Sequence, residues 1–159
     1  LRTGERVDIV VEDPQEPEFR DMAVVGGRWA AWIDRTPFGL YLADLTTGRA
    51  TRLPVDDLPT DRIALCDEWL VWLDADPLRE MTGTLRGFHL PDLTPFAVPE
   101  ALEPREYSYS LQVSRDLAVF DIVERNDTDF LSMNFTPAPQ STAIRAVRLD
   151  ATAVVEGGS

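Results

Sequence analysis

The sequence has no lysine, one histidine and one cysteine. A single cysteine cannot form a disulfide within the chain, and Cys66 lies beside Asp67 and Glu68 rather than in the electropositive setting of a reactive thiol. His89 has no partner that the sequence nominates for acid–base catalysis or metal binding. We therefore expect structural roles for both Cys66 and His89.

Long apolar runs are also absent. No run approaches the 18 or more apolar residues expected of a transmembrane helix, and no N-terminal signal pattern is present. Acidic residues number 28 against 15 basic residues, all of them arginine, which gives a formal net charge of −13. Because phosphates require cationic partners, this balance disfavours nucleic acid and anionic membrane surfaces. The sequence thus predicts neither a nucleic-acid partner nor membrane insertion.

The usual catalytic motifs are missing too. The sequence contains no nucleophile elbow, no glycine-rich phosphate loop and no zinc-ligand spacing. It therefore nominates no catalytic residue and no cofactor, and it favours a non-enzymatic role. The best metal candidate is the acidic run 124–129, in which Asp127 and Asp129 offer oxygen ligands to a hard cation such as calcium. This run lacks the glycine and the distal glutamate of an EF-hand loop, so a solvated loop is the favoured interpretation.

What the sequence does contain is an internal repeat. The segment 26–34 returns forty residues later at 66–74, and both copies carry the pattern Trp-apolar-apolar-Trp-apolar-Asp. A weaker copy without either tryptophan occupies 114–121. A period of about 40–50 residues is the signature of a repeat architecture.

The next part of each unit repeats as well. The segment 39–46 matches 87–94 with an offset of 48 instead of 40, which implies eight extra residues after Asp74. This alignment places His89 at the position of Tyr41. We therefore expect His89 to substitute for an aromatic packing residue.

Each unit reads as four short strands joined by tight turns, which is typical of a β-meander. In the tryptophan-bearing strand, alternation places Leu70 and Trp72 on one face and Trp69 and Val71 on the other. A sheet with one wet face does not fit two apolar faces, whereas a stack of sheets does. Four-stranded sheets stacked at this period are the blades of a β-propeller.

We therefore predict a single all-β domain over 1–159, made of β-propeller blades that are each a four-stranded antiparallel meander. Its parts are an orphan outer strand at 1–13, blades at 20–54, 60–99 and 107–156, and a long insertion at 122–142 within the third blade. Closed propellers have about 4–8 blades. Three blades and a strand therefore predict an incomplete ring, or a ring completed by another chain.

At this point the sequence resembles the TolB-like β-propeller family. The resemblance rests on the phrase Gly-Leu-Tyr-Leu-Ala-Asp-Leu-Thr-Thr-Gly at 39–48 and on the tryptophan phrases at 29–34 and 69–74. It covers most of 20–98 and becomes patchy beyond. The resemblance implies a repeat that serves binding, scaffolding or the gating of an attached hydrolase. It also implies an exported bacterial protein, periplasmic or extracellular.

Loop lengths indicate which rim of the predicted propeller binds. The loops between second and third strands, and those between blades, are long, and long loops on a fixed scaffold are where binding concentrates. The longest stretch, 122–142, carries the apolar side chains Phe130, Leu131, Met133 and Phe135. These residues either fold back as an extra strand or dock a protein partner.

From these observations we expect a non-enzymatic propeller segment for protein–protein interaction or scaffolding. Its partner is a protein, or additional blades from the same or another chain. Two alternatives stay open. One is the gating or substrate-selecting propeller of a larger, prolyl-oligopeptidase-like hydrolase, and the other is a glycan-processing propeller with paired carboxylates.

Overall fold

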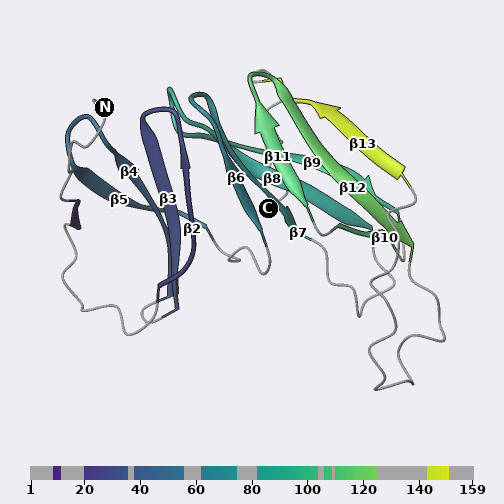
Figure 1. Ribbon diagram of the computed structural model, residues 1–159, viewed down its shortest axis with the longest axis horizontal. Coiled ribbons are helices and arrows are strands. Elements are labelled where there is room, and N and C mark those ends of the chain that lie inside the picture. Colours follow the sequence, from purple (N-terminus) through teal and green to yellow (C-terminus); the bar gives the residue numbers. More distant parts are fainter. Residues whose placement is uncertain are drawn as a thin grey trace, which may run out of the picture.

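The structure, a computed structural model, describes residues 9–11, 20–35, 38–55, 62–74, 82–103, 106–108, 110–124 and 143–150. These residues form thirteen strands, and no helix occurs among them. The strands make three antiparallel sheets that stand in a row (Figure 1). The prediction of an all-β fold built from antiparallel meanders is confirmed, and within the described ranges the sheets do not close into a ring.

The first sheet is a four-stranded meander with one added edge. Its strands are β2 (Arg20–Gly26), β3 (Trp29–Arg35), β4 (Phe38–Asp44) and β5 (Arg49–Leu53). At the outer edge β1 (Val10–Val11) pairs in parallel with β5, whose outward backbone groups accept another strand. The described part of the predicted strand 1–13 thus lies at an edge of this first sheet.

The second and third sheets follow the same plan. The second contains β6 (Ile63–Leu65), β7 (Trp69–Asp74), β8 (Gly83–His89) and β9 (Thr94–Leu102) in that order. The third contains β11 (Leu111–Ser114), β12 (Leu117–Glu124) and β13 (Ala143–Arg148), and β10 (Glu106–Tyr107) pairs with the far end of β12. The predicted fourth strand of the third unit lies outside the described residues, as does most of the insertion 122–142.

One backbone hydrogen bond recurs in all three sheets. The N–H of Leu45, just after β4, donates to the carbonyl of Arg28, in the turn before β3, at 2.8 Å. The equivalent bonds are Leu90 to Glu68 at 2.8 Å and Leu149 to Asp116 at 2.7 Å. The three sheets are therefore copies of one unit in their backbone pairing, although their side chains differ.

Strand pairing corrects one part of the sequence alignment. Trp29 pairs with Asp44, and its counterpart Trp69 pairs with His89. The third strands are therefore related by an offset of 45, not 48, and His89 occupies the position of Asp44 rather than that of Tyr41. Since the tryptophan strands are offset by 40, five extra residues precede β8, not eight.

The cause of the misalignment is a local turn. The carboxylate of Asp44 accepts the N–H of Thr46 at 2.8 Å, and the carboxylate of Asp92 accepts the N–H of Thr94 at 3.2 Å. An Asp-x-Thr phrase makes this side-chain-to-backbone turn wherever it stands. In the first sheet it begins at the last residue of β4, whereas in the second it lies three residues beyond β8. The sequence match therefore reports turn chemistry and not strand register.

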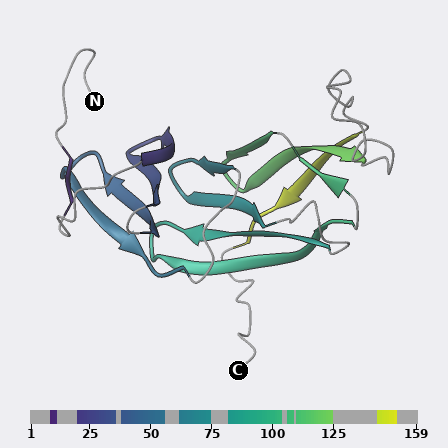
Figure 2. The same ribbon diagram turned by 90° about the horizontal axis from the view of Figure 1, so that it is seen from below.

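The sheets pack face to face, with their first strands adjacent. β6 lies next to β2 on one side and next to β11 on the other, and the two views of the ribbon show the three sheets following one another (Figures 1 and 2). The later strands of each sheet lie progressively farther from this row of first strands.

The strand β7 shows how the stack is held together. Its residues Leu70 and Trp72 face the first sheet, while Trp69 and Val71 face the third, and all four are buried. The prediction that both faces of this strand are covered is confirmed. Because alternate residues serve opposite neighbours, one strand contributes to two cores.

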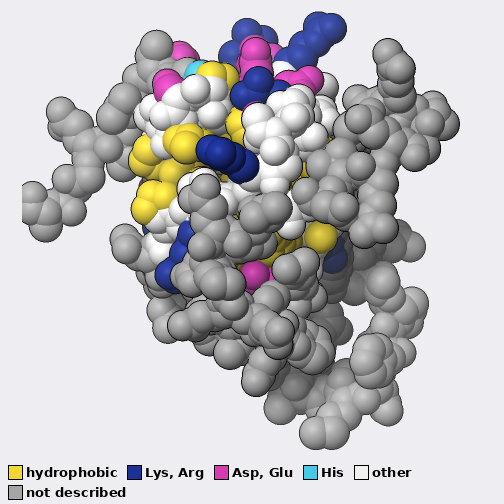
Figure 3. All heavy atoms as spheres, turned by 90° about the vertical axis from the view of Figure 1, so that its left-hand side faces the viewer, with side chains coloured by type: hydrophobic (Ala, Val, Ile, Leu, Met, Phe, Trp, Pro, Cys, Tyr) yellow, Lys and Arg dark blue, Asp and Glu magenta, His cyan; other side chains and the backbone are white. Residues whose placement is uncertain are grey.

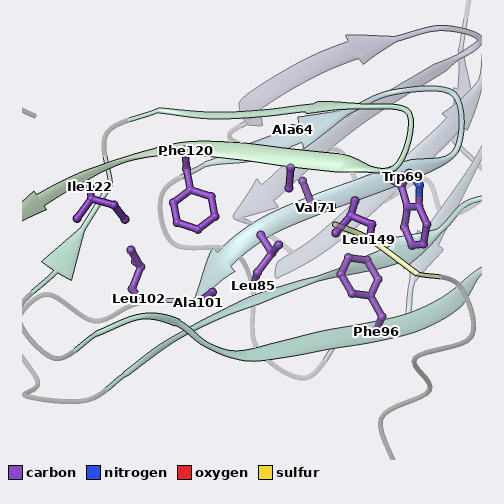
Figure 4. Close-up of a cluster of buried hydrophobic side chains, with 11 residues drawn as sticks. Ala64, Trp69, Val71, Leu85, Phe96, Ala101, Leu102, Phe120, Ile122 and Leu149 are labelled. Carbon is purple, nitrogen blue, oxygen red and sulfur yellow. The ribbon is translucent and has the colours of Figure 1, made fainter. Parts of the chain in front are cut away.

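Each gap between sheets is filled by its own apolar cluster. The cluster between the first two sheets comprises Ala31, Ile33, Leu40, Leu42, Leu53, Ile63, Leu70, Trp72, Phe88 and Leu90. The cluster between the second and third comprises Ala64, Trp69, Val71, Leu85, Phe96, Ala101, Leu102, Ala118, Phe120, Ile122 and Leu149 (Figure 4). In the second cluster the Phe96 ring meets Trp69 edge-on, with centroids 5.2 Å apart.

Because the first two sheets pack closely, there is no space for a side chain at Gly26. A Cβ at this position would overlap the backbone carbonyl of Leu65 in the second sheet. We expect Gly26→Ala to lower the free energy of unfolding by about 1–3 kcal/mol, because backbone atoms must move to relieve the overlap. Ser114 holds the equivalent position in the third sheet and is exposed. Ser114→Ala should change stability by no more than about 0.5 kcal/mol in urea titration, and equal losses would contradict the packing.

Candidate functional site

The tight turns form one rim of the stack, and the first contact on this rim joins two sheets. Asp67, in the turn before β7, accepts the backbone N–H of Arg28 on its carboxylate at 3.1 Å. Its backbone carbonyl accepts the indole N–H of Trp29 at 3.0 Å. The guanidinium of Arg28 lies over the Trp29 ring, 4.4 Å from the centroid. These polar groups are engaged in joining the first sheet to the second.

Cys66 occupies the corresponding place between the second and third sheets. Its Sγ lies 3.9 Å from the backbone carbonyl of Arg115, in the turn before β12. The side chain is half-buried and packs against the core between these sheets. The structure therefore gives Cys66 a packing position at a sheet-to-sheet contact.

His89 also lies on this rim, in a structural contact. Its ring packs against Trp69 with centroids 4.8 Å apart, and its Nδ1–H donates to the carboxylate of Asp92 at 2.7 Å. This hydrogen bond is the main reason that the pKa of Asp92 lies below its ordinary value of 3.8. His89 thus links the turn after β8, through its hydrogen bond to Asp92, with Trp69 of β7, through their ring contact.

A groove of about 290 Å³ lies between the first and second sheets, beside the same turns. Its lining includes Arg28, Trp29, Asp44, Arg49 and Leu90. The charges of Arg28 and Asp44 face each other at 3.8 Å, and the hydroxyl of Thr46 is the largest cause of the lowered pKa of Asp44. The groove thus follows the line where the first two sheets meet, and an ion pair of the first sheet lines it.

The opposite end of the third sheet is tied to the second by Arg145. Its Nη1 donates to the backbone carbonyl of Ala101 at 2.6 Å and to Glu106 at 2.8 Å, and its Nη2 donates to Glu106 at 3.2 Å. Both charged side chains are at least partly buried, which strengthens a bidentate pair of this kind. The contact fixes β13 against the end of β9.

The outward face of the third sheet is open. Ile144 is 76% exposed and Leu117 is 38% exposed. Val119 and Ala146 are cross-strand partners on the same face, between Ile144 and Leu117. These four residues, Leu117, Val119, Ile144 and Ala146, are called the open face below. It is an apolar surface in a chain of net charge −13.

The far side of the first sheet has a different character. Seen from that side, charged side chains of both signs gather at the top, along the rim of tight turns (Figure 3). The apolar residues of this side are mostly buried: Trp32 is 6% exposed and Ala43 is not exposed at all. Trp32 stacks on Tyr41 at a centroid distance of 5.5 Å. Val25 is the exception, with 71% of its surface exposed.

The site residues predicted from the sequence lie outside the described residues. They are the metal candidates Asp127 and Asp129 and the interaction candidates Phe130, Leu131, Met133 and Phe135. Among the described residues, no three His, Cys, Asp or Glu side chains come together as a metal-binding group. The metal site and the docking loop both stay predictions.

Sequence reasoning missed the open face and the Arg145 contact. The alignment of Leu117 with Trp29 and Trp69 was the available signal for the open face, because it places Leu117 at a docking position. No comparable signal existed for Arg145, whose partner Glu106 lies 39 residues away.

Comparison with known proteins gives no further guide: no family model, no curated protein and no solved structure matches this chain. In the part of the chain that the structure describes, no helix has the length and apolar character needed to cross a membrane.

The contact between His89 and Asp92 predicts a pH dependence. Because the pKa of Asp92 is lower in the folded protein, its contribution to stability is present above the ordinary value of 3.8 and is lost as the pH falls through the folded value. We expect Asp92→Asn to lower the free energy of unfolding at pH 6, with the difference from wild type shrinking at pH 3.

The control for this prediction is Glu68→Gln, which removes an exposed carboxylate from a neighbouring turn. Urea titrations of the three proteins at several pH values give the comparison. A deficit for Asp92→Asn that persists undiminished at pH 3, or one that Glu68→Gln reproduces, would show that the contact with His89 is not the cause.

Proposed function

We propose that this chain is a segment of a β-propeller of the TolB-like kind, acting as a non-enzymatic scaffold for protein–protein interaction in an exported bacterial protein. The blade arrangement is supported by three meander sheets whose first strands β2, β6 and β11 lie side by side. It is also supported by the hydrogen bond that recurs from Leu45 to Leu90 and Leu149.

The observation that carries the interaction role is the open face. Monomeric proteins tolerate single exposed apolar residues, but a contiguous apolar patch marks an interaction site. Here Leu117, Val119, Ala146 and Ile144 are contiguous, because Val119 pairs with Ala146 and the other two lie in the flanking rows of the same sheet face. Their side chains stand on β12 and β13, whose backbone pairing holds them in place.

The polar groups of the described residues support a scaffold in a second way. Arg28, Asp67, Cys66 and Arg145 each contact a neighbouring sheet. His89 and Asp92 fasten a turn. These groups hold sheets together, so the surfaces that the sheets present carry the function. The loop residues Phe130, Leu131, Met133 and Phe135 belong to the same proposal as a second docking element.

Site-specific photo-crosslinking in cells of the source organism tests this role. A photoreactive amino acid at position 144 should give a covalent adduct with another polypeptide at several-fold higher yield than the same amino acid at position 46. Thr46 is the control because it is exposed but lies on the rim of tight turns. Mass spectrometry of the adduct identifies the attached segment.

Equal yields from positions 144 and 46, or no adduct from position 144, would contradict an interaction role for the open face. Repeating the experiment with residues 126–136 deleted separates the loop from the sheet. A lower yield without loss of folded structure would support the loop as a docking element, and an unchanged yield would remove it from the proposal.

A further inference from the structure

We infer that the open face of the third sheet is the docking surface for a fourth sheet of the same repeat. This inference rests on the proposed function, since it names the partner of the surface that carries that function.

Cross-strand pairing places the open face at repeat positions that the first two sheets use for docking. Ile144 pairs with Asp121 just as Leu40 pairs with Ile33 and Leu85 pairs with Leu73. Leu40 and Leu85 belong to the clusters that fill the two gaps between sheets, and each is 0% exposed. Ile144 holds the same position and is 76% exposed. The difference is that no described sheet lies against it.

Two neighbouring repeat positions, those of Val119 and Leu117, are also covered in the first two sheets. Val119 is equivalent to Ala31 and Val71, which are both 0% exposed beneath the next sheet. Leu117 is equivalent to Trp29 and Trp69, which pack into the same two clusters. The third sheet therefore presents apolar side chains at every one of these positions without the cover that its two predecessors receive.

The two existing interfaces also specify what the partner presents. The second sheet meets the first with Leu70 and Trp72, and the third meets the second with Ala118 and Phe120. Each incoming strand thus offers a small or branched apolar residue followed, two residues later, by an aromatic ring. Leu90 and Leu149 complete the incoming faces just beyond their third strands.

Contacts between the turns of consecutive sheets also indicate how a fourth sheet would dock. The turn of the first sheet bonds to Asp67 of the second, and the turn of the second sheet, at Cys66, contacts Arg115 of the third. In both cases consecutive turns meet at the same end of the stack. A fourth sheet in the same relation brings its first turn against the exposed residues Arg115 and Asp116.

A second copy of this chain is a poorer occupant. Among the described sheets, the face that a second copy would present in the same orientation is the far side of the first sheet, which carries Ala30, Trp32 and Ala43 at the incoming positions. These residues are already buried, at 8%, 6% and 0% exposure. A separate unit of the repeat, with its incoming face uncovered, is the partner that fits.

Charged residues limit the extent of the interface at both ends, because Leu117 pairs with Arg148 and Ile144 pairs with Asp121. Asp121 stands where the first two sheets have Ile33 and Leu73, and its carboxylate accepts the Ser108 hydroxyl at 2.7 Å and the Ser110 N–H at 2.8 Å. The apolar part of the docking surface therefore runs from Leu117 toward Ile144 and is polar beyond.

Thiol labelling of a cysteine at position 144 tests the inference. The variant Ile144→Cys is made in a Cys66→Ser background, in the 159-residue chain and in a chain extended at its C-terminus by a copy of residues 62–103 that also carries Cys66→Ser. The added copy brings the incoming side chains Leu70 and Trp72. We expect a maleimide reagent to label the extended chain at least tenfold more slowly than the unextended one.

Two controls identify the cause of slower labelling. A Trp72→Glu change in the appended copy alone should restore the faster rate, because a carboxylate disfavours docking on an apolar face. A cysteine at position 25, which is 71% exposed on the first sheet, should label equally fast in both chains. Circular dichroism checks that each variant retains its β structure.

An unchanged rate at position 144, both with the appended copy 62–103 and with an appended copy of 106–150, would overturn the inference. So would labelling of the unextended chain that slows as protein concentration rises, because the occupant would then be a second copy. Either result leaves the in-cell crosslinking outcome unaffected, so failure of this inference is distinguishable from failure of the scaffold role.

Discussion

The architecture depends on one physical arrangement, the packing of neighbouring sheets through alternate residues of their second strands. In β7, Leu70 and Trp72 fill one gap while Trp69 and Val71 fill the other. Burying both faces of a strand removes large apolar side chains from water, at roughly 25 cal/mol per Å² of apolar surface. No single sheet of this size obtains that burial alone. The stack is therefore the unit of stability.

The contacts at the edges of the sheets follow from this packing. Sheets that approach closely bring their turns together, which explains why Gly26 has no space for a side chain and why Asp67 reaches the backbone of Arg28. At the other end, Arg145 bridges to Ala101 and Glu106 where apolar contact gives way to solvent. These polar groups hold adjacent sheets in one orientation.

Much of this arrangement was predictable from the sequence, for a definite physical reason. The tryptophan strands, the sheet order and the two covered faces of β7 are all encoded by short-range alternation, which a repeat displays several times over. The register of β8 was not predictable, because the Asp-x-Thr phrase at Asp92 forms the same turn whether or not it ends a strand. The pairing of Arg145 with Glu106 depends on folded geometry across 39 residues. The open face could be recognised only in the folded chain, because the sequence alone does not show that Ile144 and Leu117 are exposed.

The repeat also supplies the most direct test of the whole account, because it places Leu85 and Ile144 at the same position of consecutive sheets. Leu85→Ala and Ile144→Ala are compared by urea unfolding of the 159-residue chain. The account predicts a loss of about 2–5 kcal/mol for Leu85→Ala, which leaves a cavity between two sheets, and a change within about 0.5 kcal/mol for Ile144→Ala at an uncovered face. Similar losses at the two positions would contradict the stack as described, because Ile144 would then be buried as deeply as Leu85.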